Sequence, residues 1–460
     1  MHQVQIRQEE KESSGLVVKL ISAISGFFSE LVKMYLPDPF LFAVVLTVIT
    51  GIMGVAIQGK SPVDMILYWG QGFWGLLTFA MQMILIMLGG SVLAQAPLIR
   101  RLLDWIAGIP KTPKGAIALA TLFEGLMSYL NWGFGLIAGT LLAKKLAERV
   151  PGVHYPLIIA ASYTAFGIYA FGISSSTPLL IATKGHFLEK QMGLIPITET
   201  IFHPMNLMIL VVLLVTLPIV NSMIKPQGAL VTLKPEVSEI IVDNESKVYA
   251  TPAERAEASP IFIMIAGAMG VIFLGFYFFA KKGGFDINAV NFIFLFLAMI
   301  LHGTTRNFIN AVQGAAKGMG SMAIQFPFYA GIMGMMTSSG LVTTIAGWFV
   351  VISTPQTLPF WGFISSMFIN VFVPSGGGHW VVQGPFMIEA AKAMGADLAA
   401  VSMSVALGNG IQDMIQPMWV LPALALSGLG IRDIMGYNVI AFLWSGLVVS
   451  LGILAWGFIG

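Results

Sequence analysis

The chain has 460 residues, of which 57% are hydrophobic and only 10% are charged, whereas a soluble domain usually carries about 25% charged residues. The net charge of +2 and the lack of a basic run argue against a nucleic-acid partner, and the absence of cysteine excludes disulfides, thiol chemistry and cysteine-ligated metals. Many segments reach the roughly 20 apolar residues that a spanning helix needs. The composition therefore predicts an all-α polytopic protein embedded in a lipid bilayer.

The N-terminal residues 1–35 are expected to form a polar tail and an amphipathic lead-in. Residues 1–14 are polar and lack the apolar core and cleavage site of a signal peptide, so the first apolar segment is expected to remain in the protein. Two short amphipathic stretches, 61–70 and 306–318, are expected at the membrane interface. The apolar segments, in chain order, cover residues 39–58, 73–95, 116–142, 156–182, 205–223, 261–280, 290–301, 322–336, 341–352, 358–391, 398–427 and 434–458.

Residues 225–259 form the one clearly hydrophilic stretch between apolar segments, with mixed charges such as Lys234, Glu236 and Arg255. This composition predicts a partly disordered linker. The linker would join a first transmembrane half, 36–224, to a second half, 260–460.

The two halves resemble each other. Asn131 in the first half corresponds to Asn370 in the second, and Pro178 corresponds to Pro417, each 239 residues further along the chain. Each half has an apolar run with a polar tip, then a second run interrupted by polar residues and proline, at 172–178 and 408–417. Paired broken segments in corresponding positions are typical of transporters with two repeats and a site at the repeat interface.

The first run before the polar tip, 116–130, gives about 22 Å of helix, which is shorter than a hydrocarbon core about 30 Å thick. Either a broken helix spans the membrane there, or a re-entrant hairpin enters and leaves on one side. We favour hairpins in both halves, with tips at Asn131 and Ser375. The three glycines after Ser375 predict a loop, because glycine and Pro374 interrupt helices and non-helical backbone at membrane depth must line a cavity.

Polar residues inside the apolar runs are the candidate functional groups. Glu124, Ser128 and Asn131 lie on one helix face, and Asn409, Asp413 and Gln416 repeat the spacing. Each carboxylate would either face a cavity or pair within the bundle. His379 would either carry a proton near neutral pH or fix the tip as a neutral residue. The candidates for proton or ion coupling are His379, Asp413 and Glu124.

The deep segments carry no lysine or arginine away from their ends, so a small monoanion held by helix N-termini, amides and hydroxyls is the expected ligand. Trp132, Phe134 and Trp380 could cover a short apolar tail. No catalytic motif such as H-E-x-x-H or G-x-S-x-G is present, and no enzyme, metal or cofactor is expected. The expected substrate-binding residues are Asn131, Trp132, Gly133, Ser174, Ser175, Ser176, Thr177, Asn370, Ser375, Gly376, Gly377, Gly378, His379, Gln383, Asn409 and Gln416.

Several motifs resemble the bacterial short-chain fatty acid transporter family from about Leu36 to the C-terminus: LPDP at 36–39, WGQGFW at 69–74, NWGFG at 131–135, VPSGGGHWVVQGP at 373–385 and GIRDIMGY at 430–437. The resemblance implies an inner-membrane permease for acetoacetate and butyrate. The family is similar to an ion-transporter superfamily whose members have inverted repeats, paired re-entrant hairpins and elevator-type movement.

The resemblance also bears on coupling and assembly. It favours His379 as the proton carrier, because the type member has no carboxylate at the positions of Glu124 and Asp413. Coupling to H⁺ is expected, with a Na⁺-coupled carrier of another small carboxylate as the alternative. A channel and a homodimer are left open.

Overall fold

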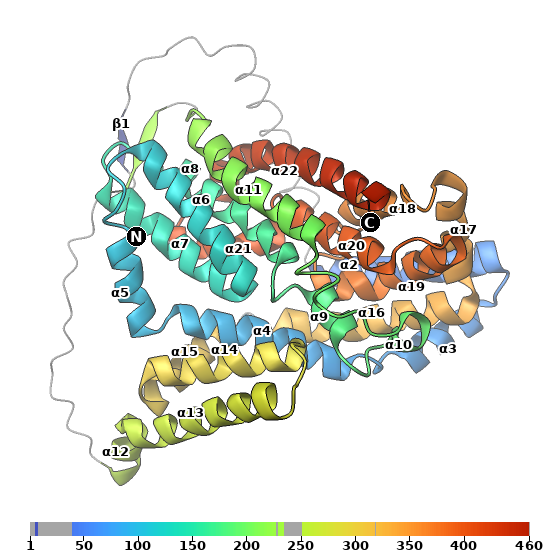
Figure 1. Ribbon diagram of the computed structural model, residues 1–460, viewed down its shortest axis with the longest axis horizontal. Helices are drawn as coiled ribbons and strands as arrows, with labels where there is room; N and C mark the ends of the chain where they lie inside the picture. The colour runs from blue at the N-terminus through green and yellow to red at the C-terminus, as the bar shows by residue number, and fades with distance from the viewer. Residues whose placement is uncertain (1–4, 8–38, 227–228, 234–250, 318, 460) are drawn as a thin grey trace.

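The computed structural model describes residues 5–7, 39–226, 229–233, 251–317 and 319–459, and these are almost entirely helical (Figure 1). The only strands in the described part are β1 (Gln5–Arg7) and β2 (Leu230–Thr232), which pair antiparallel. The first-half helices are α2 (Pro39–Gln58), α3 (Pro62–Gly72), α4 (Leu77–Ala94), α5 (Pro97–Ile106), α6 (Pro113–Leu130), α7 (Trp132–Arg149), α8 (Tyr155–Ala165), η1 (Phe166–Phe171), α9 (Ser176–Ala182), α10 (Glu189–Met192) and α11 (Pro204–Met223). Those that follow are α12 (Pro252–Ala258), α13 (Pro260–Gly275), η2 (Phe276–Ala280), α14 (Ile287–His302), α15 (Thr305–Ala316), α16 (Gly320–Ser339), α17 (Leu341–Ile352), α18 (Leu358–Ile369), α19 (Gly376–Met394), α20 (Leu398–Asp413), α21 (Pro417–Ser427) and α22 (Ile431–Ile459).

Six helices among the described residues are long and apolar enough to cross a membrane, or up to seven if the bent pair α16 and α17 counts as one span. This pair bends by 79° at Gly340, which adopts a left-handed conformation with φ of 91°. Proline in the first turn starts many helices, as at Pro113 and Pro417, because the first helical N–H has no intrahelical partner to lose. The prediction of a multi-pass membrane protein is confirmed at this level.

The structure breaks the long apolar segments where polar tips were expected. The first of these segments is interrupted only at Asn131, between α6 and α7, which pack against each other. The segment 358–391 is interrupted at residues 370–375, between α18 and α19. The segment 398–427 is interrupted only at 414–416, because α20 continues through the polar residues from Asn409 to Asp413.

The loop expected at the triple glycine is wrong, because Gly376, Gly377 and Gly378 form the first turn of α19. Ser375 caps this helix, and its Oγ accepts a hydrogen bond from the Gly378 N–H at 3.4 Å. The glycines serve close packing: a Cβ on Gly377 would lie 2.7 Å from Phe79 Cζ. A short polar N-cap therefore starts a helix even where three glycines follow.

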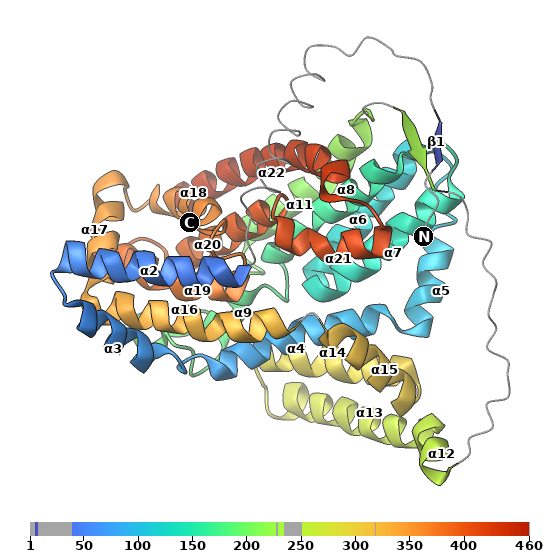
Figure 2. The same cartoon turned by 180° about the vertical axis from the view of Figure 1, so that it is seen from behind.

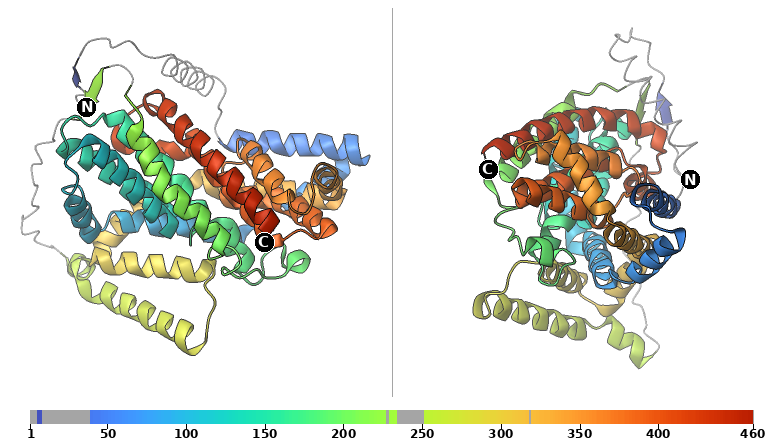
Figure 3. Two further views of the ribbon diagram at one scale, coloured as in Figure 1. Left: turned by 45° about the horizontal axis from the view of Figure 1, so that its top comes forward. Right: turned by 90° about the vertical axis from the view of Figure 1, so that its right-hand side faces the viewer.

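The helices form two layers. An outer layer contains α2, α3, α4 and α13–α17, and Figure 2 shows α2, α3 and α16 side by side within it. An inner bundle contains α6–α9, α11 and α18–α22. In both views of Figure 3, α22, which ends at the label C, lies on the side of this bundle away from α13. The layers meet where α4 packs against α7 and where α16 packs against α19. Helices from both halves of the chain therefore contribute to each layer.

The hydrophilic linker contributes β2 and α12 to the structure. Residues 234–250, where the sequence predicts partial disorder, and residues 1–4 and 8–38 of the N-terminal tail lie outside the described residues. The two amphipathic stretches form α3 and α15.

Candidate functional site

Asn131 forms the turn between α6 and α7 and is fully buried. Its Oδ1 accepts a hydrogen bond from the Phe134 N–H at 2.9 Å, and its Nδ2 donates to the Ile86 carbonyl oxygen at 3.3 Å. The next residue, Trp132, donates its N–H to Ser174 Oγ at 3.0 Å. The first tip is therefore fixed both to α4 and to the break before α9.

Ser375 has the same role at the second tip. As the N-cap of α19 it leaves the N–H groups of Gly376 and Gly377 at helix positions that have no intrahelical acceptor. A Cβ on Gly376 would lie 3.1 Å from Asn409 Oδ1 and 3.3 Å from both Ser176 Oγ and the Tyr169 hydroxyl. Glycine at 376 therefore leaves space in a polar cradle that a larger residue would fill.

A small cavity of about 20 Å³ lies between the two tips. This volume suffices for about one water molecule. Trp132, Ser176 and Gly376 each begin a helix at this cavity, and Trp419 lies in the first turn of α21. Helix N-termini carry positive partial charge, so their convergence favours an anion. The lining consists of Met83, Trp132, Phe166, Tyr169, Ser176, Ser375, Gly376, Gly377 and Trp419.

Four aromatic rings form one side of this cavity. Trp132 and Trp419 pack edge to face with ring centroids 5.4 Å apart, and Phe166 lies 6.0 Å from Trp419 and 5.0 Å from Tyr169. The Nε1 atoms of Trp132 and Trp419 are buried and have no hydrogen-bond partner among the described residues. A buried N–H donor normally has an acceptor. Trp69, Trp380 and Trp456 also have an unpartnered Nε1 among the described residues, but only Trp132 and Trp419 belong to the cavity lining.

A cluster of amides and one carboxylate lies directly behind Tyr169. Asn370 Nδ2 donates to Asp413 Oδ1 at 2.7 Å and to the Asn409 carbonyl oxygen at 3.2 Å. The Tyr169 hydroxyl lies 2.6 Å from Asn409 Oδ1 and 2.8 Å from Asp413 Oδ2. Gln416 Nε2 donates to the Asn370 carbonyl oxygen at 3.0 Å. Three residues expected from the sequence to bind substrate, Asn370, Asn409 and Gln416, therefore lie together around Asp413, one residue removed from the cavity.

His379 is fully buried and lies outside the cavity lining. Its Nε2 lies 3.1 Å from Ser366 Oγ and also hydrogen-bonds to Gln383 Oε1. The Ser366 hydroxyl donates to the Val405 carbonyl oxygen at 2.7 Å. Gln383 Nε2 in turn donates to the Gly362 carbonyl oxygen at 3.1 Å. These bonds tie α19 to α18 and α20.

Glu124 is also fully buried outside the lining. Its Oε1 accepts from Ser128 Oγ at 3.1 Å and its Oε2 accepts from Ser162 Oγ at 3.3 Å. A Cβ on Gly139 would lie 1.5 Å from Oε2, so the carboxyl group occupies the space that this glycine leaves on α7. The structure therefore places Glu124 inside the first helix pair.

The remaining candidates surround the cavity without lining it. Ser175 occupies the N-cap position of α9 without a side-chain capping bond, and Thr177 is buried in the first turn of α9. Gly133 packs against α4, where its Cβ would lie 2.8 Å from the Met87 carbonyl oxygen. Of the aromatic residues expected to cover an apolar tail, Trp132 lines the cavity whereas Phe134 and Trp380 are buried elsewhere.

Sequence reasoning missed Met83, Phe166, Tyr169 and Trp419. Met83, Phe166 and Tyr169 carry no local signal, because they lie within ordinary apolar runs. Trp419 follows Pro417 in the first turn after a break, as Trp132 follows Asn131, and this shared position is the signal that could have identified it.

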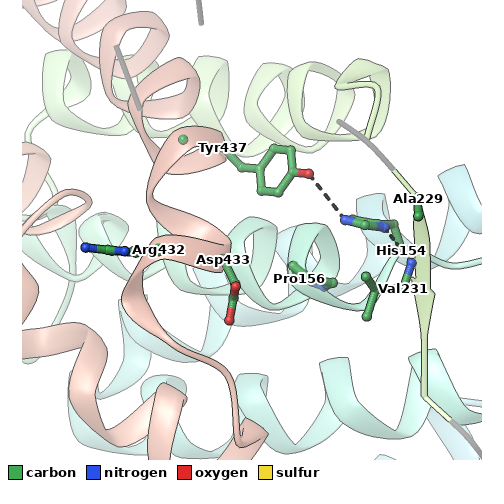
Figure 4. A pocket seen from close by; sticks show the side chains of 8 residues that line it. His154, Pro156, Ala229, Val231, Arg432, Asp433 and Tyr437 are labelled. Carbon is green, nitrogen blue, oxygen red and sulfur yellow. Dashed lines mark hydrogen bonds between the residues drawn. The ribbon is translucent and has the colours of Figure 1, made fainter. Parts of the chain in front are cut away.

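A second cavity of about 260 Å³ lies at the end of the inner bundle, between β2 and α22 (Figure 4). His154 Nδ1 accepts a hydrogen bond from the Val231 N–H at 3.2 Å, and its Nε2 lies 3.3 Å from the Tyr437 hydroxyl. Burial lowers the pKa of His154 from 6.5 to about 4, which keeps the ring neutral at neutral pH. This histidine fastens β2 to the bundle, whereas Figure 4 shows Arg432 pointing away from it.

Comparison with known proteins gives one consistent result. The family model described as short chain fatty acid transporter matches residues 20–456. A candidate short-chain fatty acid transporter of Escherichia coli K12 is 42% identical over 437 residues, which cover 94% of this chain and 99% of that protein. A candidate transporter of the same description from Haemophilus influenzae Rd is 40% identical over 444 residues, with the same coverage of 94% and 99%.

The fold is similar to a solved transporter structure. The crystal structure of the Alcanivorax borkumensis YdaH transporter, whose title reports an unusual topology, matches with a TM-score of 0.58. The match covers 92% of this chain and 99% of that one at 14% sequence identity, so it shows a common fold alone.

Proposed function

Because the chain belongs to the short-chain fatty acid transporter family, we propose that it is a secondary active transporter that moves short-chain fatty acids such as acetoacetate and butyrate across the cytoplasmic membrane together with H⁺. The family consists of transporters, so the chain is not an enzyme. The observation that carries the proposal is the cavity at which α7 and α19 begin, beside the first turn of α21, since it offers positive helix ends and no fixed cation to a small monoanion.

The substrate carboxylate would lie against the N–H groups of Gly376 and Gly377 and the hydroxyls of Ser176 and Ser375. The indole N–H groups of Trp132 and Trp419 would supply further donors, and the aromatic rings would cover a short apolar tail. A cavity of about 20 Å³ cannot hold even butyrate. Binding of butyrate would therefore require the tips or the rings to move apart.

Transport would proceed by an elevator-type movement of the inner bundle against the outer layer, in a fold built from two inverted repeats with paired re-entrant hairpins. Two features support this proposal. Both tips and the cavity belong mainly to the inner bundle, and the helix that begins at each tip packs against the outer layer, α7 against α4 and α19 against α16 and α17. Spin labels on cysteines at Lys190 and Lys281, in the otherwise cysteine-free chain, would report the movement. If the distance between the two labels were the same with and without butyrate, this result would argue against the elevator-type movement.

The sequence suggests three proton carriers, His379, Asp413 and Glu124, and the family resemblance favours His379. Of these, only Asp413 has a side chain that hydrogen-bonds to a residue of the cavity lining, through the Tyr169 hydroxyl. His379 and Glu124 bond to serines and a glutamine outside the lining.

The test is uptake of labelled acetoacetate or butyrate into proteoliposomes under a pH gradient and, separately, under a Na⁺ gradient, with empty liposomes as the control for leakage of the neutral acid. Saturable, protein-dependent uptake driven by the pH gradient and able to exchange with unlabelled substrate is expected. Uptake driven only by Na⁺ would support the Na⁺-coupled alternative. Passage without counterflow would indicate a channel.

A substitution tests the position of the site. Gly376→Ala would place a methyl group into the cradle formed by Asn409, Ser176 and Tyr169 and should abolish exchange in a folded protein. Gly446→Ala, where a Cβ meets nothing within 4 Å, is the matched control in α22. Exchange by Gly376→Ala at the wild-type rate would place the substrate elsewhere.

A further inference from the structure

We infer that the coupling proton is carried by Asp413 and that the Tyr169 hydroxyl communicates its presence to the substrate cavity. This inference rests on the proposed function and names the group that makes the cavity sensitive to protons. It depends on the hydrogen-bond geometry among four side chains that come from η1, α20 and the end of α18.

The orientation of the two amides follows from their partners. Asn370 donates from Nδ2 to the Asn409 carbonyl oxygen and to Asp413 Oδ1, so its Oδ1 accepts from Asn409 Nδ2. Asn409 must then present its own Oδ1, an acceptor, to the Tyr169 hydroxyl 2.6 Å away.

The Tyr169 hydroxyl has one proton and two close oxygen neighbours, Asn409 Oδ1 at 2.6 Å and Asp413 Oδ2 at 2.8 Å. If the tyrosine proton goes to Asn409, the second contact needs a proton from Asp413. If Asp413 is ionised, the Tyr169 hydroxyl donates its proton to the carboxylate. Asn409 Oδ1 and the Tyr169 oxygen then face each other with no proton between them. Every contact is satisfied only when Asp413 is protonated, with its O–H donating to Tyr169.

The surroundings of Asp413 supply no compensating cation. It is fully buried, and none of the ion pairs between described residues includes it. The titratable groups that face it are two phenols: Tyr169, and Tyr163, whose hydroxyl donates to the Asp413 carbonyl oxygen at 2.5 Å.

The other elements packed on α20 are α9, α18, α19 and α22. His379 of α19 hydrogen-bonds to Ser366 and Gln383. The charged residues of α19, Glu389 and Lys392, lie near its C-terminal end, where Lys392 Nζ donates to the Gln191 carbonyl oxygen at 2.7 Å. Those at the start of α22, Arg432 and Asp433, line the cavity beside His154. The described side chains of α9 and α18 include no charged residue. A negative charge on Asp413 would therefore act on the cavity without a neighbouring cation.

A single residue, Tyr169, separates Asp413 from the proposed substrate cavity. Tyr169 lines the cavity, and its hydroxyl and Asn409 Oδ1 border the N-terminus of α19, where the carboxylate is proposed to bind. With Asp413 ionised, two anions would face each other across Tyr169. With Asp413 protonated, Tyr169 donates to Asn409 and the site is neutral. Proton and substrate therefore bind cooperatively, and by linkage each strengthens the binding of the other.

The test uses the full-length protein in proteoliposomes with labelled butyrate. In wild type, butyrate should bind at least about 5-fold more tightly at pH 6 than at pH 8, although it is ionised at both. In Asp413→Asn the amide imitates the protonated acid, because its N–H₂ can donate to Tyr169 while its oxygen accepts from Asn370. This variant should keep exchange, lose accumulation under a pH gradient and bind butyrate independently of pH.

Tyr169→Phe retains the carboxyl group and removes the hydroxyl, so it should fold and should also lose the pH dependence of butyrate affinity. It decides the question if Asp413→Asn does not fold. Tyr329→Phe removes another buried hydroxyl, which bonds to Gln325 within α16, and Glu199→Gln removes an exposed carboxylate; both should behave as wild type.

The outcomes separate the inference from the function on which it rests. Accumulation and pH dependence like those of wild type in both Asp413→Asn and Tyr169→Phe would overturn the assignment of the proton and leave the transport function standing. Coupling of wild type to Na⁺ alone would do the same. The absence of saturable butyrate exchange in wild type would instead overturn the proposed function, and the inference with it.

Discussion

Trp419 should set the upper limit on the length of the acyl chain. Its ring is only 7% exposed, and its centroid lies 5.4 Å from Trp132 and 6.0 Å from Phe166, so it closes one side of the cavity. Trp419→Ala would open this side to a longer tail. Each buried methylene contributes about 0.8 kcal/mol, so the two extra methylenes of hexanoate are worth about 1.6 kcal/mol, or about a 15-fold gain in affinity relative to butyrate.

The assay is competition of unlabelled butyrate or hexanoate against labelled butyrate in counterflow. The ratio of the two inhibition constants cancels any general loss of binding, including the loss of the indole N–H donor. Trp419→Phe retains an aromatic ring and should shift the ratio by less. Trp348→Ala, at a tryptophan that is 49% exposed on α17, is the control. A wild-type ratio in an active Trp419→Ala protein would refute the placement of the tail against the aromatic rings.

Two further predictions concern stability. Gly139→Ala places a Cβ 1.5 Å from Glu124 Oε2, and overpacking of this kind costs about 1–3 kcal/mol, so thermal unfolding in detergent should begin at a lower temperature. Glu124→Ala in the same chain should restore part of the loss, and no restoration would mean that the carboxyl group lies elsewhere. The pKa of His154 is lowered from 6.5 to about 4, so the unfolded chain takes up the proton first, and wild type should lose stability as pH falls through this window. His154→Gln should flatten that loss in unfolding measured at several pH values, and an unchanged slope would contradict the burial of a neutral ring.

The sequence predicts the membrane helices and the breaks well, because both depend on local patterns. The apolar segment 39–58 coincides with α2, and the expected tips at Asn131 and Ser375 are the N-caps of α7 and α19. A short polar residue before an apolar run is a helix start whether or not its surroundings are known. The apolar segment 261–280 likewise corresponds to α13 and η2.

The site itself is only partly predictable, because it depends on contacts between distant segments. The three glycines interrupt helices by propensity, yet they form the first turn of α19 behind the N-cap Ser375, where Phe79 and Tyr329 of the outer layer leave no room for a Cβ on Gly377 or Gly378. Tyr169 has no local feature that separates it from other buried tyrosines. Its importance appears only when Asn409 and Asp413, more than 200 residues away in sequence, are placed beside its hydroxyl.

The small, buried cavity explains why a carrier of anions would have no arginine or lysine at its binding site. When the cavity closes without substrate, an ionised side chain would be buried with no partner, which is strongly unfavourable. Helix N-termini avoid this difficulty, since Asn131 and Ser375 satisfy one N–H group each and the rest carry only partial charge. A carboxyl group that binds a proton has a similar advantage in the proposed loaded state, because protonated Asp413 leaves no buried negative charge beside the bound anion.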